Sequence, residues 1–295
     1  MNISYVKNKC LPGQLGKGKC FGTFGELLQG VLEDGQDFLV TFPINLFSNA
    51  TFISNSEDLI VEPAYKKKSQ KLAKMILEHF NLPQSGELYI ESNLPIGKGF
   101  ASSSADMVST ARSIEDCFGI EVPVPLLQHM MSQLETSDGV MYSGVVSFYN
   151  KRVELIEEFN YLPPLTIVGV DNGGEVNTSN FHKVVKDYSI EEKKRYTQML
   201  AEITDALKDL DISRIAQISS ESAHMNQKVN PSRVFDNVNA VCNVVGGLGV
   251  IKAHTGTYSG IILSVDDKYY EYKLKRSIEL LQDLCGNVSI FHSLH

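Results

Sequence analysis

A run of serines directly before a predicted helix is the feature of this sequence most suggestive of chemistry. In NLPIGKGFASSSADMVST, residues 93–110, Gly97 and Gly99 precede the serines at 102–104. The first N–H groups of a helix have no partner within it and carry partial positive charge, so they attract anions. Glycine lets a polyanion approach the backbone, and serine hydroxyls add donors that also ligate Mg²⁺. A serine that merely caps the helix is the structural alternative, but the whole pattern favours a phosphate-binding site.

Two carboxylates form a second candidate group, in the loop after another predicted helix. Glu135 and Asp138 stand in Glu-Thr-Ser-Asp-Gly, residues 135–139. An aspartate in such a turn can bond its own backbone. The glutamate can ligate Mg²⁺ or pair with a cation.

Hydrophobic periodicity predicts the elements that must hold these groups in place. Apolar residues at helical spacing after the serines predict a helix that ends near Phe118, with Gly119 as its C-terminal cap. Further helices are expected at 69–82, 124–135, 190–209, 211–228 and 267–285, with a loop and helix over 230–244. Strands are expected within 37–54 with an interruption at Pro43, at 86–95, in a hairpin through Asn150-Lys151, at 164–171 and at 287–293, and residues 1–20 are expected to be loop-rich. This mixture predicts an α+β fold, with a hinge near residues 161–164.

Composition and charge exclude several classes of protein. The 295 residues, 43% hydrophobic and 21% charged, predict a globular protein of one large or two ordinary domains. A net charge of -8 argues against a nucleic-acid binder, and the one basic run, residues 66–68, is expected to be a solvated loop or helix start. The chain has no run of 18 apolar residues and no apolar signal core at its N-terminus, which predicts no membrane partner and a cytoplasmic location. Five scattered cysteines fit reduced thiols better than disulfides or a zinc site.

One glycine motif, residues 13–20, matches a P-loop only in part. GQLGKGKC, residues 13–20, matches the spacing G-x-x-x-x-G-K but ends in Cys20, where a P-loop needs a serine or threonine for Mg²⁺. Pro12 precedes it, and the segment that follows is a poor helix start. A glycine-rich turn is therefore the better interpretation.

The 95–105 segment, Pro-Ile-Gly-Lys-Gly-Phe-Ala-Ser-Ser-Ser-Ala, resembles the second signature of the GHMP kinases, P-x-x-x-G-L-x-S-S-A, with Phe100 in place of leucine. Residues 22–30 resemble the first signature of that family, which lies on the substrate side of the cleft. Residues 137–141 stand where the family has its catalytic aspartate, and 246–260 fall where its third signature belongs, although the match there is weak.

A narrower likeness is to the L-threonine kinases of cobalamin synthesis and propanediol utilisation. GTFGELLQG is similar to their G-T/S-x-G-E-L-x-Q-G, residues 135–138 to their E-P-T-D, and Ala-His-Thr-Gly-Thr at 253–257 to their A-H-S-G-T. Phe21 in place of proline, and Thr136 and Ser137 around the aspartate, depart from that pattern and leave the acceptor open.

The resemblance implies roles for particular residues. Asp138 is expected to be catalytic, and Ser103 and Glu135 to ligate Mg²⁺. The nucleotide is expected to contact Pro95, Gly97, Lys98, Gly99, Ala101, Ser102, Ser103 and Ser104, and the substrate Gly25, Glu26, Gln29, Thr136 and His254.

The resemblance also implies an architecture and a reaction. The fold is expected to have two lobes, a ribosomal-S5-like N-terminal lobe over 1–160 and a ferredoxin-like C-terminal lobe over 161–295. With ATP and Mg²⁺, and as a monomer or homodimer, the protein is expected to phosphorylate the hydroxyl of L-threonine. Serine, homoserine or another short hydroxy compound is the enzymatic alternative. A non-catalytic ligand sensor on the same fold and an S5-like nucleic-acid module are the rivals from other classes, the last disfavoured by the acidic charge.

Overall fold

The computed structural model describes residues 13–54, 58–174, 187–253 and 256–295, which build one mixed sheet covered by helices. The strands are β1 (Leu15–Val31), β2 (Asp37–Ile53), β3 (Leu59–Glu62), β4 (Gly86–Ser92), β5 (Val146–Tyr149), β6 (Glu154–Glu158), β7 (Leu165–Asp171), β8 (Gly249–Lys252), β9 (Tyr258–Ser264) and β10 (Val288–His292). The helices are α1 (Lys67–His79), α2 (Ser102–Phe118), α3 (Val124–Ser132), α5 (Ile190–Lys208), α6 (Ile212–Asn226), α7 (Phe235–Val245) and α8 (Tyr270–Cys285). The fold is therefore α+β, as predicted.

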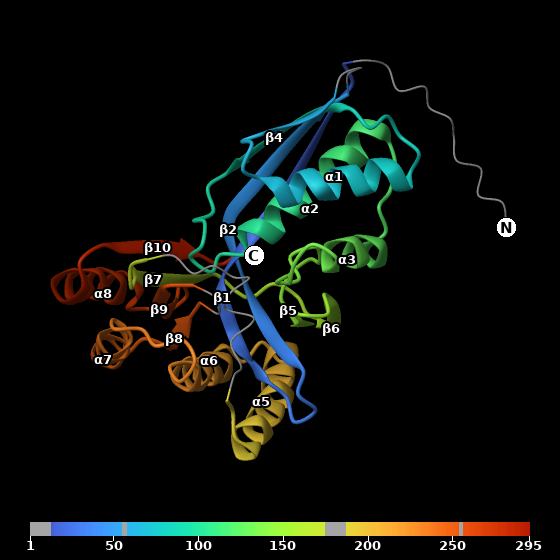
Figure 1. The fold of residues 1–295 in the computed structure, drawn as a ribbon. Coiled ribbons are helices and arrows are strands. Elements are labelled where there is room, and N and C mark those ends of the chain that lie inside the picture. Colours follow the sequence, from blue (N-terminus) through green and yellow to red (C-terminus); the bar gives the residue numbers. More distant parts are fainter. Residues whose placement is uncertain (1–12, 55–57, 175–186, 254–255) are drawn as a thin grey trace.

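The two long strands β1 and β2 are the backbone of the molecule. The strand order is β10-β7-β9-β8-β1-β2-β4-β3, with the β5–β6 hairpin attached to β2. Each long strand has 17 residues, and together they run as an antiparallel pair from one end of the molecule to the other (Figure 1). Strand β4 with helices α1 and α2 lies at one end of this pair and helix α5 at the other, while β7–β10 with α7 and α8 extend to one side of it (Figure 1).

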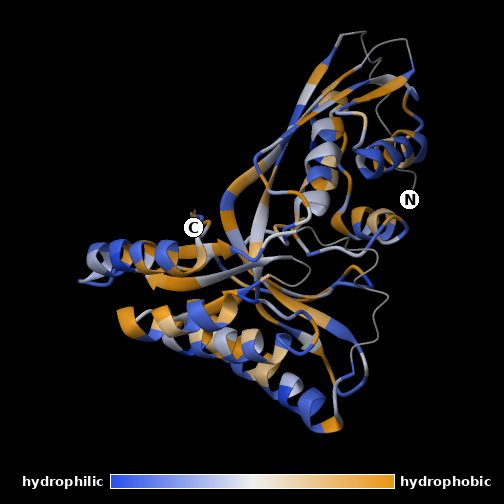
Figure 2. Ribbon diagram, turned by 60° about the vertical axis from the view of Figure 1, so that its left-hand side comes forward, coloured by the Kyte–Doolittle hydropathy of each residue, from blue (hydrophilic) through white to orange (hydrophobic). Residues whose placement is uncertain are grey.

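The core lies between the sheet and its helices. Helix α2 packs along β1 and β2, while α5 and α6 pack on β1 nearer the opposite end. Every residue of β1 from Cys20 to Val31 is buried, because helices and neighbouring strands cover that stretch. The helices are amphipathic, and in Figure 2 hydrophilic and hydrophobic residues alternate along them.

Gly16 and Gly18, from the glycine motif at residues 13–20, have a packing role in β1. A Cβ on Gly18 would lie 2.0 Å from the carbonyl oxygen of Ser109 in α2, and one on Gly16 would lie 2.2 Å from the amide nitrogen of Cys117. These glycines let the backbone of α2 approach β1 closely. The segment is thus neither a P-loop nor a turn.

Most predicted elements are confirmed, and the failures lie in the first 62 residues and in the glycine-rich segment near 249–264. The expected helices and the hairpin are present, and Gly119, at φ 61°, caps α2. The loop-rich interpretation is wrong from Leu15 onward, where β1 begins, and β2 passes through Pro43 without interruption. Pro43 pairs with Thr23 next to irregular register, where the missing N–H is tolerated. The strands β3, β8 and β9 were not expected.

No helix in the described ranges combines the length and apolarity that a bilayer crossing requires.

Candidate active site

Helix α2 begins at the serines without a side-chain cap. Its N-cap residue is Ala101, in the left-handed conformation at φ 55°, and no side chain bonds the cap. The first amide to bond back along the helix is that of Ala105, which donates to the carbonyl of Ala101 at 2.9 Å. The amides of residues 102–104 are therefore those that a helix leaves for an external acceptor. The serine-cap alternative is not realised.

A cavity opens at this helix start and contains both predicted carboxylates. Its lining consists of Gly97, Gly99, Phe100, Ala101, Ser102, Ser103, Ser104, Glu135, Thr136 and Asp138. The 95–105 segment and the loop after α3 thus face one another across one hollow, although they are some 30 residues apart in the sequence.

Glu135 links the helix start to the carboxylate loop. Its Oε1 accepts a hydrogen bond from the Ser103 hydroxyl, and its Oε2 forms an ion pair with Lys68 at the start of α1. A serine hydroxyl and one carboxylate beside a phosphate site are the protein ligands that Mg²⁺ uses with a nucleotide. The pair therefore fits a magnesium ion that is also held by phosphate oxygens.

Asp138 is half-buried next to this pair. Burial, and then the negative charge of Glu135, raise the pKa of Asp138 to about 7, while Lys68 and a hydrogen bond with Ser104 oppose the shift. A carboxylate with a pKa near neutrality is suited to accept a proton at physiological pH.

The loop that carries Asp138 is fixed from both sides. The Ser137 amide donates to the carbonyl of Asn150 at 3.1 Å, and the Ser137 hydroxyl donates to that of Ser104 at 3.3 Å. Gly139 follows at φ 75°, where a Cβ would lie 2.8 Å from Val146. The loop is therefore anchored between the β5–β6 hairpin and α2.

The first predicted motif meets the 95–105 segment through its backbone. The amides of Thr23 and Gly25, both in β1, donate to the carbonyls of Phe100 at 3.2 Å and Gly99 at 3.1 Å. Below this contact Phe100 packs edge-on against Phe24, with ring centroids 5.4 Å apart. The aromatic ring that replaces the usual leucine is thus fully buried.

The third predicted motif packs against the 95–105 segment through Gly256 and the neighbouring Tyr258. A Cβ on Gly256 would lie 1.9 Å from the carbonyl oxygen of Lys98, and one on Gly25 would lie 2.5 Å from the Cα of Ala253. Tyr258 adds its ring to that of Phe100, with centroids 5.0 Å apart. The structure therefore brings together the three segments that the sequence singled out, and packs them without space for side chains at these glycines.

The predicted substrate residues lie deeper than the cavity. Gln29 is buried, donates through Nε2 to the Lys252 carbonyl at 3.1 Å, and accepts from Asn226 at 3.0 Å. Glu26 is also buried and stands opposite Lys252 in the β1–β8 pairing. Of the predicted substrate residues only Thr136 lines the cavity. His254 lies outside the described residues.

The sequence analysis did not assign three charged residues near the site to it: Asp171, Lys66 and Lys68. Lys98, expected at the phosphates, forms an ion pair with Asp171 at 2.6 Å, and Asp171 also accepts a hydrogen bond from Thr257. Partial burial of Asp171 acts to raise the pKa of its carboxyl group, but the hydrogen bonds that it accepts outweigh burial, so the pKa is lowered.

The basic run is a helix start, as expected, because α1 begins at Lys67. Lys66 is not solvated, because it is largely buried and pairs with Asp106, whereas Lys68 stays partly exposed while it pairs with Glu135.

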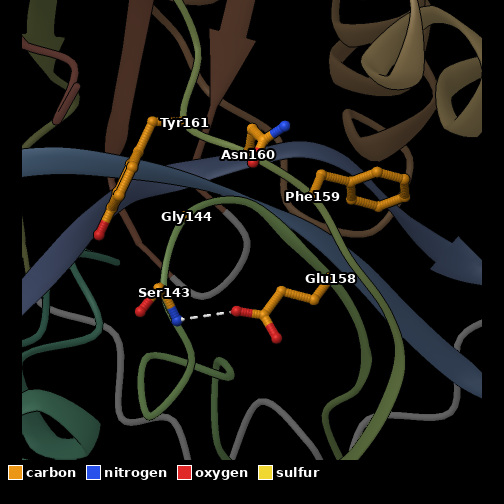
Figure 3. Close-up of a pocket in the computed structure, with 6 residues that line it drawn as sticks. All are labelled: Ser143, Gly144, Glu158, Phe159, Asn160 and Tyr161. Atoms are coloured by element: carbon orange, nitrogen blue, oxygen red, sulfur yellow. Dashed lines mark hydrogen bonds between the residues drawn. The ribbon is translucent and has the colours of Figure 1, made fainter.

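A second cavity, of about 340 Å³, lies at the end of the β5–β6 hairpin and shares no residue with the first (Figure 3). Its lining consists of Ser143, Gly144, Glu158, Phe159, Asn160 and Tyr161. The carboxylate of Glu158, its one charged group, accepts from the Ser143 amide at 3.3 Å (Figure 3). It contains neither a helix start nor a carboxylate pair.

Comparison with known proteins agrees with this geometry. Residues 67–148 match the family "GHMP kinases N terminal domain". The L-threonine kinase of Citrobacter freundii is 24% identical over 250 residues, 83% of this chain and 85% of that protein. Among solved structures, homoserine kinase from Cytophaga hutchinsonii aligns with a TM-score of 0.72 at 14% identity, covering 99% of this chain and 97% of that one. L. major mevalonate kinase in complex with R-mevalonate aligns with a TM-score of 0.68 at 16% identity, covering 98% and 97%.

The family match spans both sides of the cavity, from α1 through the 95–105 segment to the loop of Asp138 and into β5. The structural likeness extends over nearly the whole chain. Residues 67–148 are thus similar to the N-terminal domain of the GHMP kinases, and the whole chain has the fold of the homoserine and mevalonate kinases.

Proposed function

We propose that the acceptor of this ATP-dependent phosphotransferase is a short hydroxy amino acid, with L-threonine favoured and O-phospho-L-threonine as product. The observation that carries the proposal is the cavity in which the start of α2, the Ser103–Glu135 contact and Asp138 meet. L-Threonine is favoured because an L-threonine kinase is similar over most of the chain.

In this proposal the start of α2 binds the nucleotide phosphates. The free amides of residues 102–104 and the partial positive charge of the helix face the phosphate oxygens. Gly97 and Gly99, at φ 69° and 87°, hold the preceding loop in a shape that residues with side chains rarely adopt. Ser103 and Glu135 hold Mg²⁺, which neutralises phosphate charge when bound.

Asp138 orients the acceptor hydroxyl and takes its proton. The hydroxyl oxygen forms a bond to the γ-phosphorus of ATP as the bond from that phosphorus to the β,γ-bridging oxygen breaks, and ADP leaves. Because phosphoryl transfer depends mainly on positioning and charge stabilisation, the proton can move late in this step. The raised pKa of Asp138 makes its carboxylate a competent acceptor for it.

The test is ADP release from Mg²⁺–ATP with L-threonine, L-serine, L-homoserine, mevalonate and galactose offered separately. We expect turnover with L-threonine to exceed that with the other four by at least about tenfold, since a missing methyl group or one mispaired polar contact costs about that much. Turnover with another alcohol alone would reject the proposed acceptor. Binding of ATP without turnover of any acceptor would support the ligand-sensor alternative.

A further inference from the structure

The proposed mechanism assigns no role to Lys68, although this lysine contacts one of the proposed metal ligands. Its ammonium contacts Glu135 Oε2, while the other oxygen of that carboxylate accepts from Ser103. The contact joins α1 to the proposed metal ligands across 67 residues of sequence. Of the lysines around the cavity, this one alone is paired with a carboxylate that the proposed reaction assigns to a metal ion.

The start of α1 is unfavourable as a helix terminus. Three lysines, residues 66–68, occupy its N-cap and first two positions, no acidic residue lies in the first turn, and no side chain caps it. Cations at a helix N-terminus oppose the helix dipole. A sequence that breaks a local rule in this way commonly does so at a functional site.

The three lysines differ in their freedom to move. The side chain of Lys66 is 9% exposed and pairs with Asp106, which is 4% exposed, so it is part of the core. Lys68 is 40% exposed on its side chain, whereas its partner Glu135 is 8% exposed. Lys67 is exposed and makes no ion pair among the described residues. Only Lys68 has both a partner in the site and room to change it.

The balance of charge in the cavity indicates which group the Lys68 ammonium would contact after leaving Glu135. In the free protein the cavity contains the carboxylates of Glu135 and Asp138, and a nucleotide adds several more negative charges. Lys98 is held by Asp171 and by the carbonyl of Gly174. Lys68 is therefore the cation best placed to face the terminal phosphate once Glu135 is engaged elsewhere.

We propose that Lys68 is a further active-site residue, which holds Glu135 in the free protein and contacts the terminal phosphate of the nucleotide when Glu135 ligates a divalent cation. This inference rests on the proposed function. During transfer its ammonium stabilises the charge on the phosphoryl oxygens and forms no covalent bond.

The test compares Lys68→Met and Lys68→Arg with Lys67→Met, a matched control that removes a neighbouring cation from the same helix turn. Two quantities are measured: the affinity for Mg²⁺–AMPPCP by calorimetry, which needs no acceptor, and kcat with the acceptor that the parent protein uses. We expect Lys68→Met to weaken binding by about tenfold and to lower kcat by about 100-fold, as for loss of one preorganised charge-stabilising donor. Lys68→Arg should recover at least a tenth of the parent kcat, and Lys67→Met should stay within about twofold of the parent.

Parent-like binding and kcat in Lys68→Met, or equal losses in Lys68→Met and Lys67→Met, would overturn the proposal. Failure of the proposed function gives a different result. If the parent binds Mg²⁺–AMPPCP but phosphorylates no acceptor, the acceptor assignment fails and the binding comparison still decides the role of Lys68. Thermal unfolding of each variant, expected to match the control within a few degrees, separates lost contacts from lost folding.

Discussion

At the scale of single residues, Asp138 is the group on which the proposed chemistry most depends. Its neighbours Glu135 and Ser104 come from the proposed metal-binding and phosphate-binding sides of the cavity, so in the proposed mechanism it lies where an acceptor hydroxyl would meet both. A substitution of Asp138 can therefore test proton transfer separately from nucleotide binding.

The first prediction concerns Asp138→Asn. The amide keeps the size of the side chain but cannot accept the hydroxyl proton, so kcat should fall by about 10²–10⁴-fold. Affinity for Mg²⁺–AMPPCP should stay within about threefold of the parent, because the amides of residues 102–104 are untouched. Steady-state kinetics and calorimetry measure the two effects, and a kcat close to that of the parent would remove Asp138 from the mechanism.

The second prediction concerns pH. Because the pKa of Asp138 is raised to about 7, only the ionised carboxylate above that pH accepts a proton, and kcat/KM should fall about tenfold per pH unit below it. The folded protein binds this proton more tightly than the unfolded chain, so Asp138 contributes less to stability as pH rises from about 4 to 7. Asp138→Asn should therefore raise Tm more at pH 8 than at pH 5, as measured by thermal unfolding. An equal change at both values would contradict the pKa shift.

At the scale of elements, the site depends on how closely α2 lies on β1. Gly16 and Gly18 face the backbone of α2 with no room for a methyl group. Since α2 presents the proposed phosphate-binding amides at its first turn, its distance from β1 sets the position of the proposed site. A substitution in β1 outside the cavity lining is therefore expected to alter nucleotide binding.

The third prediction follows from that packing. Gly18→Ala places a methyl group 2.0 Å from the Ser109 carbonyl, and relief of this overlap must shift α2. We expect unfolding free energy to fall by about 1–3 kcal/mol and affinity for Mg²⁺–AMPPCP to fall with it. Lys17→Ala, on the exposed side of the same strand, is the control and should change both by little. Parent-like stability in Gly18→Ala would show that α2 is not held at this distance.

At the scale of the whole molecule, two parts share one sheet. The proposed division into lobes 1–160 and 161–295 cuts the chain between β6 and β7, yet β8 pairs with β1 and helices α5 and α6 cover β1. An aromatic cluster of Phe24, Phe100, Tyr258 and Phe291 joins β1, the 95–105 segment, β9 and β10 beneath the cavity. The site is thus built where the parts meet.

The fourth prediction is that a fragment of residues 1–160 does not fold stably alone. It would remove β8, α5 and α6 from β1, in which Leu27 and Leu28 are both fully buried in the complete chain, at a cost of about 1.5–3 kcal/mol for each such side chain that becomes exposed. The complete chain should unfold in a single cooperative transition. Circular dichroism and calorimetry check both statements, and a folded, cooperatively melting fragment would support independent lobes instead.

The sequence by itself determined the features whose causes are local. The glycines and serines of the 95–105 segment, the periodicity of α2 and its glycine cap predict a helix start with free amides, because capping and amphipathicity act within a few residues. Asp138 and Glu135 were also recognisable, and the structure places both in the cavity with Ser103. The resemblance in those motifs pointed to the family that the comparisons support.

Only the tertiary structure decided which charges surround those residues. Lys68 meets Glu135 across 67 residues, and Lys98 meets Asp171 across 73, and neither contact leaves a periodic or local signal. The extent of β1 was hidden for the same reason: a strand buried on both faces lacks alternation, and its glycines, read alone, favoured a turn. Their purpose became visible only with α2 packed against them, because close approach of two backbones is a property of the pair and not of either segment.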